Sequence, residues 1–136
     1  MNTTVSARVL LIATEVRQWV EARDGCMDYP SRDMNGWCAI ASAELHRRLA
    51  AEGIYSVLFM SEGFGAHVFI VVDDHVVDVT ATQFLEFKNK KVVVLHTKEA
   101  ELYDFYETSQ MFETPKKLRK YQVRNHWPGE QIALPS

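Results

Sequence analysis

The hydrophobic pattern changes its period at Gly53, and this change constrains the fold more than any other feature of the chain. Before Gly53, apolar side chains recur every three or four residues, as in amphipathic helices. After it, they come in short runs between turn-forming residues, as in strands. With 136 residues, the chain has room for one compact core. We expect a single domain, residues 1–136, of the α+β class, with N-terminal helices packed on a mainly antiparallel sheet.

Two helices are predicted before the change of period. Residues 5–20 carry an apolar stripe that leaves Arg17 on the outside. Residues 37–52 form an alanine-rich helix that stops at Gly53, because glycine commonly ends a helix. Asn35 is a suitable N-cap for this second helix.

Strands dominate the rest of the chain. The expected strands are residues 55–60, 67–72, 75–80 and 91–96. The last of these runs is apolar on both faces, so we expect it at the centre of the sheet. Residues 99–106 predict a short helix with Leu102, Phe105 and Tyr106 on one side, and residues 115–124 favour an exposed basic helix.

The turn between the second and third strands decides which side chains share a face of the sheet. With a two-residue turn at Asp73-Asp74, Asp78 becomes the diagonal neighbour of His67, roughly 7 to 8 Å away between backbones. The Asp78 carboxylate and the His67 imidazole can bridge that distance with a hydrogen bond. A turn at Asp74-His75 keeps both on one face, whereas a three-residue loop, 73–75, would separate them.

Cys38 begins the second predicted helix, where the positive end of the helix dipole favours a thiolate. It is therefore a candidate nucleophile. His67 could stabilise the thiolate and later protonate a leaving group, and Asp78 could orient the imidazole. The oxyanion formed on attack needs donors, for which the Cys38 backbone N–H and the side-chain amides of Asn35 or Gln83 are candidates.

Three segments carry a resemblance to a known superfamily. Gly36-Trp37-Cys38 at a helix start, Gly65 to Ile70 on a strand and Val77 to Phe84 resemble the core of the papain-like, transglutaminase-like enzymes, in particular small bacterial and toxin-borne members. The resemblance covers residues 36–84. The chain lacks the Gly-Ser-Cys-Trp pattern of classical papain enzymes and is shorter than a two-lobed protease, so ordinary endopeptidase activity is not expected.

This resemblance implies thiol-dependent acyl transfer or hydrolysis, of the amidase, deamidase, peptidase or transglutaminase type, on a protein or peptide amide. It implies Cys38 as nucleophile, His67 as base and Asp78 as the group that orients it. Such a mechanism requires no metal and no organic cofactor. The substrate, the acyl acceptor and the oligomeric state stay open.

Each candidate residue also has an ordinary structural interpretation. A lone cysteine such as Cys38 is usually a small buried apolar residue. Trp37 fits either the wall of a substrate cleft or the core, and His75 is the first rival to His67. Cys26, in a polar loop, is interpreted as incidental.

Two other classes of function compete with the enzyme. One is a non-catalytic protein-binding module on the same scaffold, which would use an edge strand or the basic segment 115–124. The other is a nucleic-acid-associated protein, but a net charge of −3 gives no overall attraction to nucleic acid. Residues 1–4 lack the features of a secretory signal and no segment is long enough to span a membrane, so we expect a cytoplasmic protein with reduced cysteines.

Overall fold

The computed structural model describes residues 1–23, 26–27, 34, 36–62, 66–108, 110–127 and 130–132. Its helices are α1 (Thr3–Glu21), α2 (Cys38–Ala51), α3 (Thr97–Ala100) and α4 (Pro115–Arg124), and its strands are β1 (Val57–Ser61), β2 (His67–Val72), β3 (His75–Asp78), β4 (Val93–His96) and β5 (Gln110–Phe112). Short 3-10 helices occupy η1 (Ala81–Gln83), η2 (Leu85–Phe87) and η3 (Asp104–Tyr106). The described strands form one antiparallel sheet in the order β4-β3-β2-β1-β5. The predicted α+β class is confirmed.

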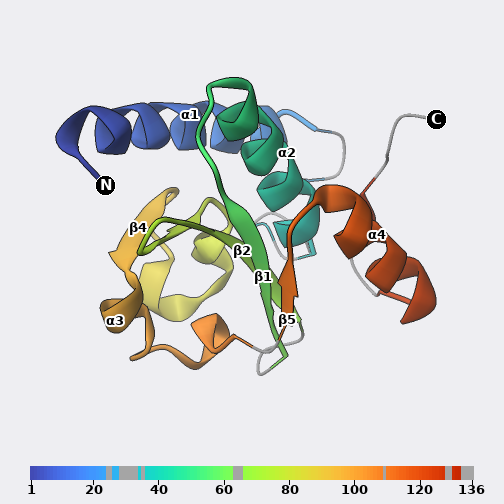
Figure 1. Ribbon diagram of the computed structural model, residues 1–136. Helices are drawn as coiled ribbons and strands as arrows, with labels where there is room; N and C mark the ends of the chain where they lie inside the picture. The colour runs from blue at the N-terminus through green and yellow to red at the C-terminus, as the bar shows by residue number, and fades with distance from the viewer. Residues whose placement is uncertain are drawn as a thin grey trace.

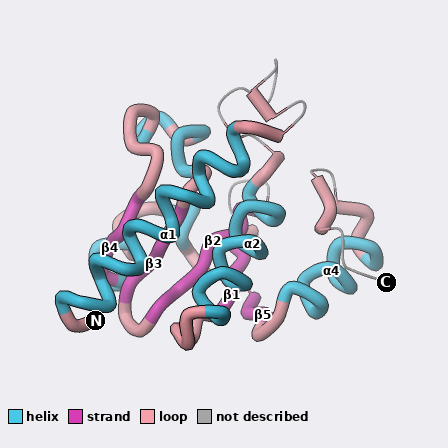
Figure 2. Tube along the Cα trace, turned by 90° about the horizontal axis from the view of Figure 1, so that it is seen from above, coloured by secondary structure: helices cyan, strands magenta, loops and turns pink. Residues whose placement is uncertain are grey.

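Helices α1 and α2 cover one face of this sheet (Figures 1 and 2). The apolar stripe of α1 and the alanine-rich side of α2 pack against every second residue of β2, namely Val68, Ile70 and Val72. Asn2 caps α1 through a 2.8 Å hydrogen bond from the Val5 N–H to its side-chain oxygen. Both predicted helices are confirmed, and Asn35, the predicted cap of α2, lies outside the described residues.

The opposite face of the sheet carries a second, mostly aromatic layer. The buried residues of this aromatic cluster are Phe69, Val76, Ala81, Phe87, Val93, Ala100, Phe105 and Tyr106. Because side chains alternate along a strand, His67 and Phe69 of β2 point away from α1 and α2. The candidate histidine therefore belongs to the aromatic side of the sheet.

Arg17 is a correction to the sequence analysis, because it is buried and not outside the apolar side of α1. Its guanidinium donates hydrogen bonds to the Val79 carbonyl oxygen at 3.0 Å and to Thr82 Oγ1 at 2.9 Å, and its Nε lies 3.6 Å from the Glu21 carboxylate. These partners compensate the charge, whereas periodicity counts any arginine as a surface residue. Arg17 thus fixes α1 to the segment that follows β3.

The strand predicted at the centre of the sheet, residues 91–96, is instead the edge strand β4. It pairs with β3 alone among the described strands. Val93 of this strand joins the aromatic cluster, and Val92, just before the strand, packs on the helix side, whereas Val94 is exposed. An edge strand between two packed layers has the same apolar pattern as a central strand.

Residues 99–106 do not form the single helix that was predicted. The chain forms α3, ends it at Ala100, and turns again at η3. Phe105 and Tyr106 are buried as expected, but Leu102 is 81% exposed. Strand β5, which pairs with β1, was not predicted because three residues are too few to show a period.

Candidate active site

The hairpin of β2 and β3 brings His67 and Asp78 together. Val72 pairs with His75, so the turn is the two-residue turn at Asp73-Asp74, and the expected register is confirmed. His67 begins β2 and Asp78 ends β3, which places them at the same end of the hairpin. His67 Nε2 lies 2.7 Å from Asp78 Oδ2, and both side chains are buried. His75, the rival histidine, lies at the opposite end of β3.

The Asp78 carboxylate is held by more donors than His67 alone. Its Oδ2 accepts a 2.8 Å hydrogen bond from the Tyr106 hydroxyl. Its Oδ1 accepts hydrogen bonds from the Thr80 N–H at 2.9 Å and from Thr80 Oγ1 at 3.2 Å. Burial alone would raise the pKa of Asp78, but His67 and these hydrogen bonds outweigh burial and hold the pKa below its ordinary value. Asp78 is therefore a carboxylate over the neutral pH range.

The imidazole of His67 is correspondingly biased toward its charged form. Burial alone would lower its pKa, but the charge and hydrogen bond of Asp78, followed by the hydrogen bond and charge of Cys38, raise it to about 10. Because Nε2 donates to Asp78, Nδ1 is the nitrogen left for Cys38. The site thus couples a carboxylate, an imidazolium and a thiol in that order.

Cys38 reaches this pair from the other layer of the fold. It is the first residue of α2, where backbone N–H groups have no acceptor within the helix. Helix α2 is attached to β2 by a 3.2 Å hydrogen bond from Ser42 Oγ to the Val68 carbonyl oxygen. The Cys38 sulfur lies 4.0 Å from the carbonyl oxygen of Ala66, a residue held at a φ of 67° immediately before His67. A non-glycine residue in this left-handed region is uncommon.

Aromatic rings enclose the imidazole. The edge of Phe84 meets it at 4.7 Å between ring centroids, and Phe69 stacks on it at 6.0 Å. Tyr106 lies 6.0 Å away on the side of Asp78. Only 2% of His67 is exposed, against 6% of Cys38. Low solvent access strengthens the interaction between His67 and Asp78.

The secondary candidates occupy different places. Gln83 is close, with its side-chain amide nitrogen 3.5 Å from His67 Nδ1 and 3.0 Å from the Thr80 carbonyl oxygen. Trp37 is buried in the helix-side core, as one of its two interpretations predicted, and it also lines a surface hollow with Trp19 and Arg23 whose described lining includes neither Cys38 nor His67. Asn35, the other predicted oxyanion donor, is outside the described residues.

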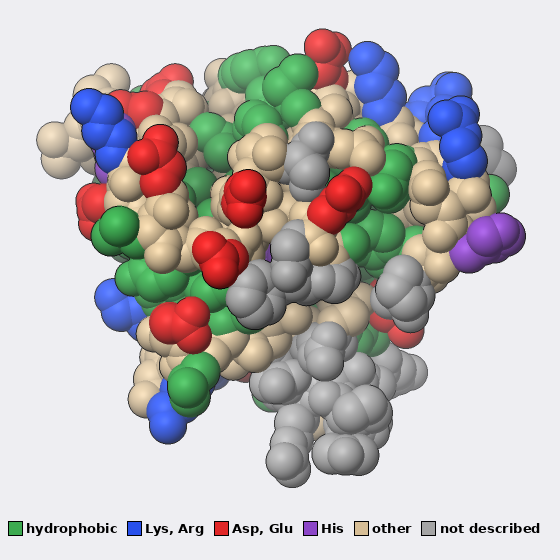
Figure 3. Space-filling view, turned by 90° about the horizontal axis from the view of Figure 1, so that it is seen from below, with side chains coloured by type: hydrophobic (Ala, Val, Ile, Leu, Met, Phe, Trp, Pro, Cys, Tyr) green, Lys and Arg blue, Asp and Glu red, His purple; other side chains and the backbone are tan. Residues whose placement is uncertain are grey.

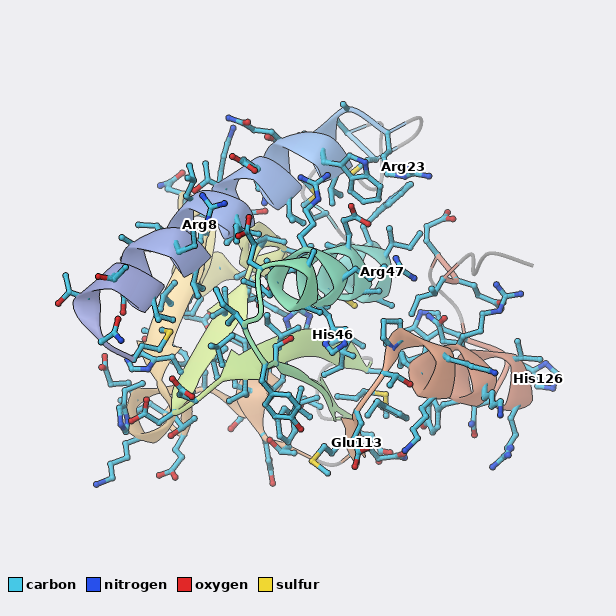
Figure 4. The ribbon with its side chains drawn as sticks, turned by 45° about the horizontal axis from the view of Figure 1, so that its top comes forward. Arg8, Arg23, His46, Arg47, Glu113 and His126 are labelled. Carbon is cyan, nitrogen blue, oxygen red and sulfur yellow. The ribbon has the colours of Figure 1, made fainter. Side chains whose placement is uncertain are left out.

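Cys26, interpreted as incidental from the sequence, and His46 both lie outside the site. Cys26 is a free, fully buried thiol whose Sγ is 3.2 Å from Met34 Sδ. Burial raises the pKa of Cys26 to about 11. His46 of α2 (Figure 4) is partly buried, and its Nδ1 lies 2.9 Å from Ser56 Oγ, which comes just before β1.

Sequence analysis missed three residues that hold this arrangement. Thr80 could have been found, because a threonine two residues after an aspartate commonly bonds to its side chain. Tyr106 carries no such signal, since it lies 28 positions after Asp78 and reaches it only through the tertiary fold. Arg17 was missed because a charged side chain is expected at the surface.

Comparisons with protein-family models, with curated proteins and with solved structures found no significant match to this chain. In the described part of the chain, no helix has both the length and the apolar character to cross a bilayer. Nor do three or more His, Cys, Asp or Glu side chains gather there around a possible metal position. The geometry of the site therefore carries the functional argument.

Proposed function

We propose that this protein is a cysteine acyl-transfer enzyme of the papain-like, transglutaminase-like type. In this proposal Cys38 is the nucleophile, His67 the acid and base, and Asp78 the group that orients His67. The substrate is a carboxamide or ester, as a protein or peptide presents. The observation that carries the proposal is the 2.7 Å contact between His67 Nε2 and Asp78 Oδ2, because it leaves His67 Nδ1 for the thiol.

The reaction begins with the Cys38 thiolate and the His67 imidazolium. The sulfur forms a bond to the carbonyl carbon, and the carbonyl π electrons move onto oxygen. When the tetrahedral intermediate collapses, the bond to the leaving amine or alcohol breaks and His67 Nδ1 gives that group its proton. Water or an amine then attacks the thioester, His67 accepts a proton from it, and the Cys38 thiolate is released. Water as acceptor gives hydrolysis or deamidation, and an amine gives transfer.

The residues around the triad support these roles. The N-terminus of α2 offers positive potential to the thiolate and to the oxyanion. Gln83 lies on the Nδ1 side of the ring, where an oxyanion donor would be useful. Asp78, fixed by Tyr106 and Thr80, keeps one imidazole tautomer in place.

Alkylation with iodoacetamide tests the proposal without a known substrate. Intact-mass analysis should show a single fast adduct below pH 8, and peptide mapping should place it on Cys38. The adduct should persist in Cys26→Ala and disappear in Cys38→Ala, which makes Cys26 the matched control. His67→Ala should slow alkylation about tenfold or more, because the thiolate loses its imidazolium partner.

A Cys38 that reacts no faster than free cysteine would contradict the enzyme and favour the non-catalytic binding module. Retained fast alkylation in His67→Ala would contradict the role of the imidazole. After the thiol test, incubation with glutamine-containing proteins separates the reaction types, since deamidation adds about one mass unit and cross-linking joins whole chains.

A further inference from the structure

A pocket of about 470 Å³ lies on the aromatic side of the sheet. Its floor consists of Phe59, Phe69, Val71 and Val76 from the three central strands, and its other wall is the segment 97–108. This segment runs from α3 through η3 along the lower edge of the molecule in Figure 1. The volume suits a small organic ligand. The described lining includes neither Cys38 nor His67, so this is a second site.

Aromatic rings form a continuous part of the pocket wall. Phe59 stacks on Phe69 at 6.2 Å between centroids, and Phe69 meets Tyr106 edge-on at 5.0 Å. Tyr103 in turn meets Tyr106 at 6.3 Å. The faces of such rings carry negative potential and attract organic cations. The wall offers both apolar contact and a preference for positive charge.

The rim of the pocket adds full negative charges. Glu101, Asp104 and Glu107 line it and are exposed. No Lys, Arg or His occurs in the lining that the structure describes, and no described cation forms an ion pair with these three acids. Ser61 Oγ donates a 3.2 Å hydrogen bond to the Asp104 carbonyl oxygen, which fixes this rim to β1. Figure 3, from below, shows acidic side chains with hydrophobic ones between them.

We propose that this pocket binds an organic monocation: an ammonium group carried on an apolar stem. The stem packs on the phenylalanine and valine floor, and the ammonium lies near the aromatic faces and the acidic rim. Two sources present this chemistry, a free aryl- or alkylamine and a lysine side chain. A neutral ligand would lose the attraction of the rim, and an anion would be repelled by it.

Ligand binding to the 136-residue chain tests this assignment. Benzylammonium is titrated against isotopically labelled protein, with benzyl alcohol as the neutral control and phenylacetate as the anionic control. We expect saturable NMR shifts at Val71, Val76, Thr97 and Ala100 with benzylammonium, about fivefold tighter binding than for benzyl alcohol, and none for phenylacetate. Blocked lysine, N-acetyl-lysine N-methylamide, is the second arm. Tighter binding of blocked lysine assigns the site to a side chain, and weaker binding assigns it to a free amine.

Charge-removing variants make the test specific to the rim. The double variant Glu101→Gln, Glu107→Gln should weaken benzylammonium binding about fivefold, whereas Glu15→Gln, an exposed acid on α1, should leave it unchanged. These substitutions are at exposed positions, and the spectrum of the free protein verifies the fold. Equal affinity for benzyl alcohol, shifts confined to other residues, or unchanged affinity in the double variant would each overturn the proposal.

Discussion

The Tyr106 hydroxyl donates a 2.8 Å hydrogen bond to Asp78 Oδ2, the same oxygen that His67 Nε2 contacts. Tyr106 belongs to η3, which packs on β1 and β2 from the aromatic side. The carboxylate is therefore fixed by a group outside the hairpin that carries it. The Tyr106 hydroxyl keeps its proton, because burial and the negative charge of Asp78 both raise the pKa of Tyr106.

Tyr106→Phe should weaken both the fold and the site. It removes one hydrogen bond to a charged group while keeping the ring, so we expect a loss of about 1.5 to 3 kcal/mol in the free energy of unfolding. Urea denaturation measures this loss. Alkylation of Cys38 should also slow, because Asp78 would orient His67 less firmly. Tyr103→Phe, in the same aromatic cluster, is the control, and an equal effect of both variants would contradict a special role for Tyr106.

The His67–Asp78 pair predicts a loss of stability toward alkaline pH. The folded state raises the pKa of His67 from 6.5 to about 10, so the folded protein retains a proton that the unfolded chain releases. Its contribution to stability is complete below about pH 6.5 and is lost as pH rises through 10. Asp78, with a lowered pKa, acts in the opposite range: its contribution is present above its ordinary pKa and is lost as pH falls through the folded value.

The measurement is the free energy of unfolding between pH 6.5 and 8.5. It should fall with pH in the natural protein and stay nearly flat in His67→Gln, so the slopes are compared rather than the absolute values. Higher pH is avoided because Cys26, whose pKa is raised from 9.0 to about 11, adds a loss of its own there. Identical slopes would mean that His67 does not hold its extra proton.

Removing the buried guanidinium of Arg17 should destabilise the segment after β3. Arg17→Leu removes the hydrogen bond to Thr82 Oγ1 and leaves the buried Val79 carbonyl oxygen without its Arg17 donor, at a cost of roughly 1 to 3 kcal/mol for that carbonyl. Denaturation in urea gives the value. Arg8→Leu is the matched control, since Arg8 pairs with Glu52 at the surface and should cost less than about 1 kcal/mol. A similar small loss in both variants would contradict an anchoring role.

Gln83→Ala should separate oxyanion binding from thiol activation. Alkylation by iodoacetamide forms no oxyanion, so its rate should be unchanged. Acylation by p-nitrophenyl acetate does form one, and loss of a donor should slow it by about 10² to 10³. The two rates are measured on the same preparation. Equal slowing of both would instead indicate that Gln83 positions His67.

Local sequence patterns were sufficient to predict the elements that a regular spacing of apolar residues or a short turn defines. The three-and-four spacing predicted α1 and α2, and the Asp73-Asp74 turn predicted the register of β2 and β3. That register predicted His67 beside Asp78, because alternation of side chains in a strand is a strict geometric rule.

Features that depend on contacts between distant segments were wrong or missed. Arg17 was placed outside because its hydrogen-bond partners, Val79 and Thr82, are more than 60 positions away in the sequence. Residues 91–96 were placed at the centre of the sheet because their apolar pattern is the same as that of a central strand. Neither case contains a local signal that could reveal the partner.

The residues that hold the candidate site in place are spread along the chain, from Arg17 in α1 to Tyr106 in η3. During synthesis the cysteine leaves the ribosome long before Tyr106, so no nascent chain that ends earlier can contain the complete donor set of Asp78. Until η3 packs on the sheet, the Asp78 carboxylate of an emerging polypeptide would lack its hydrogen bond from Tyr106 and would hold His67 less firmly. The rate of labelling at Cys38 would then report when η3 packs on the sheet.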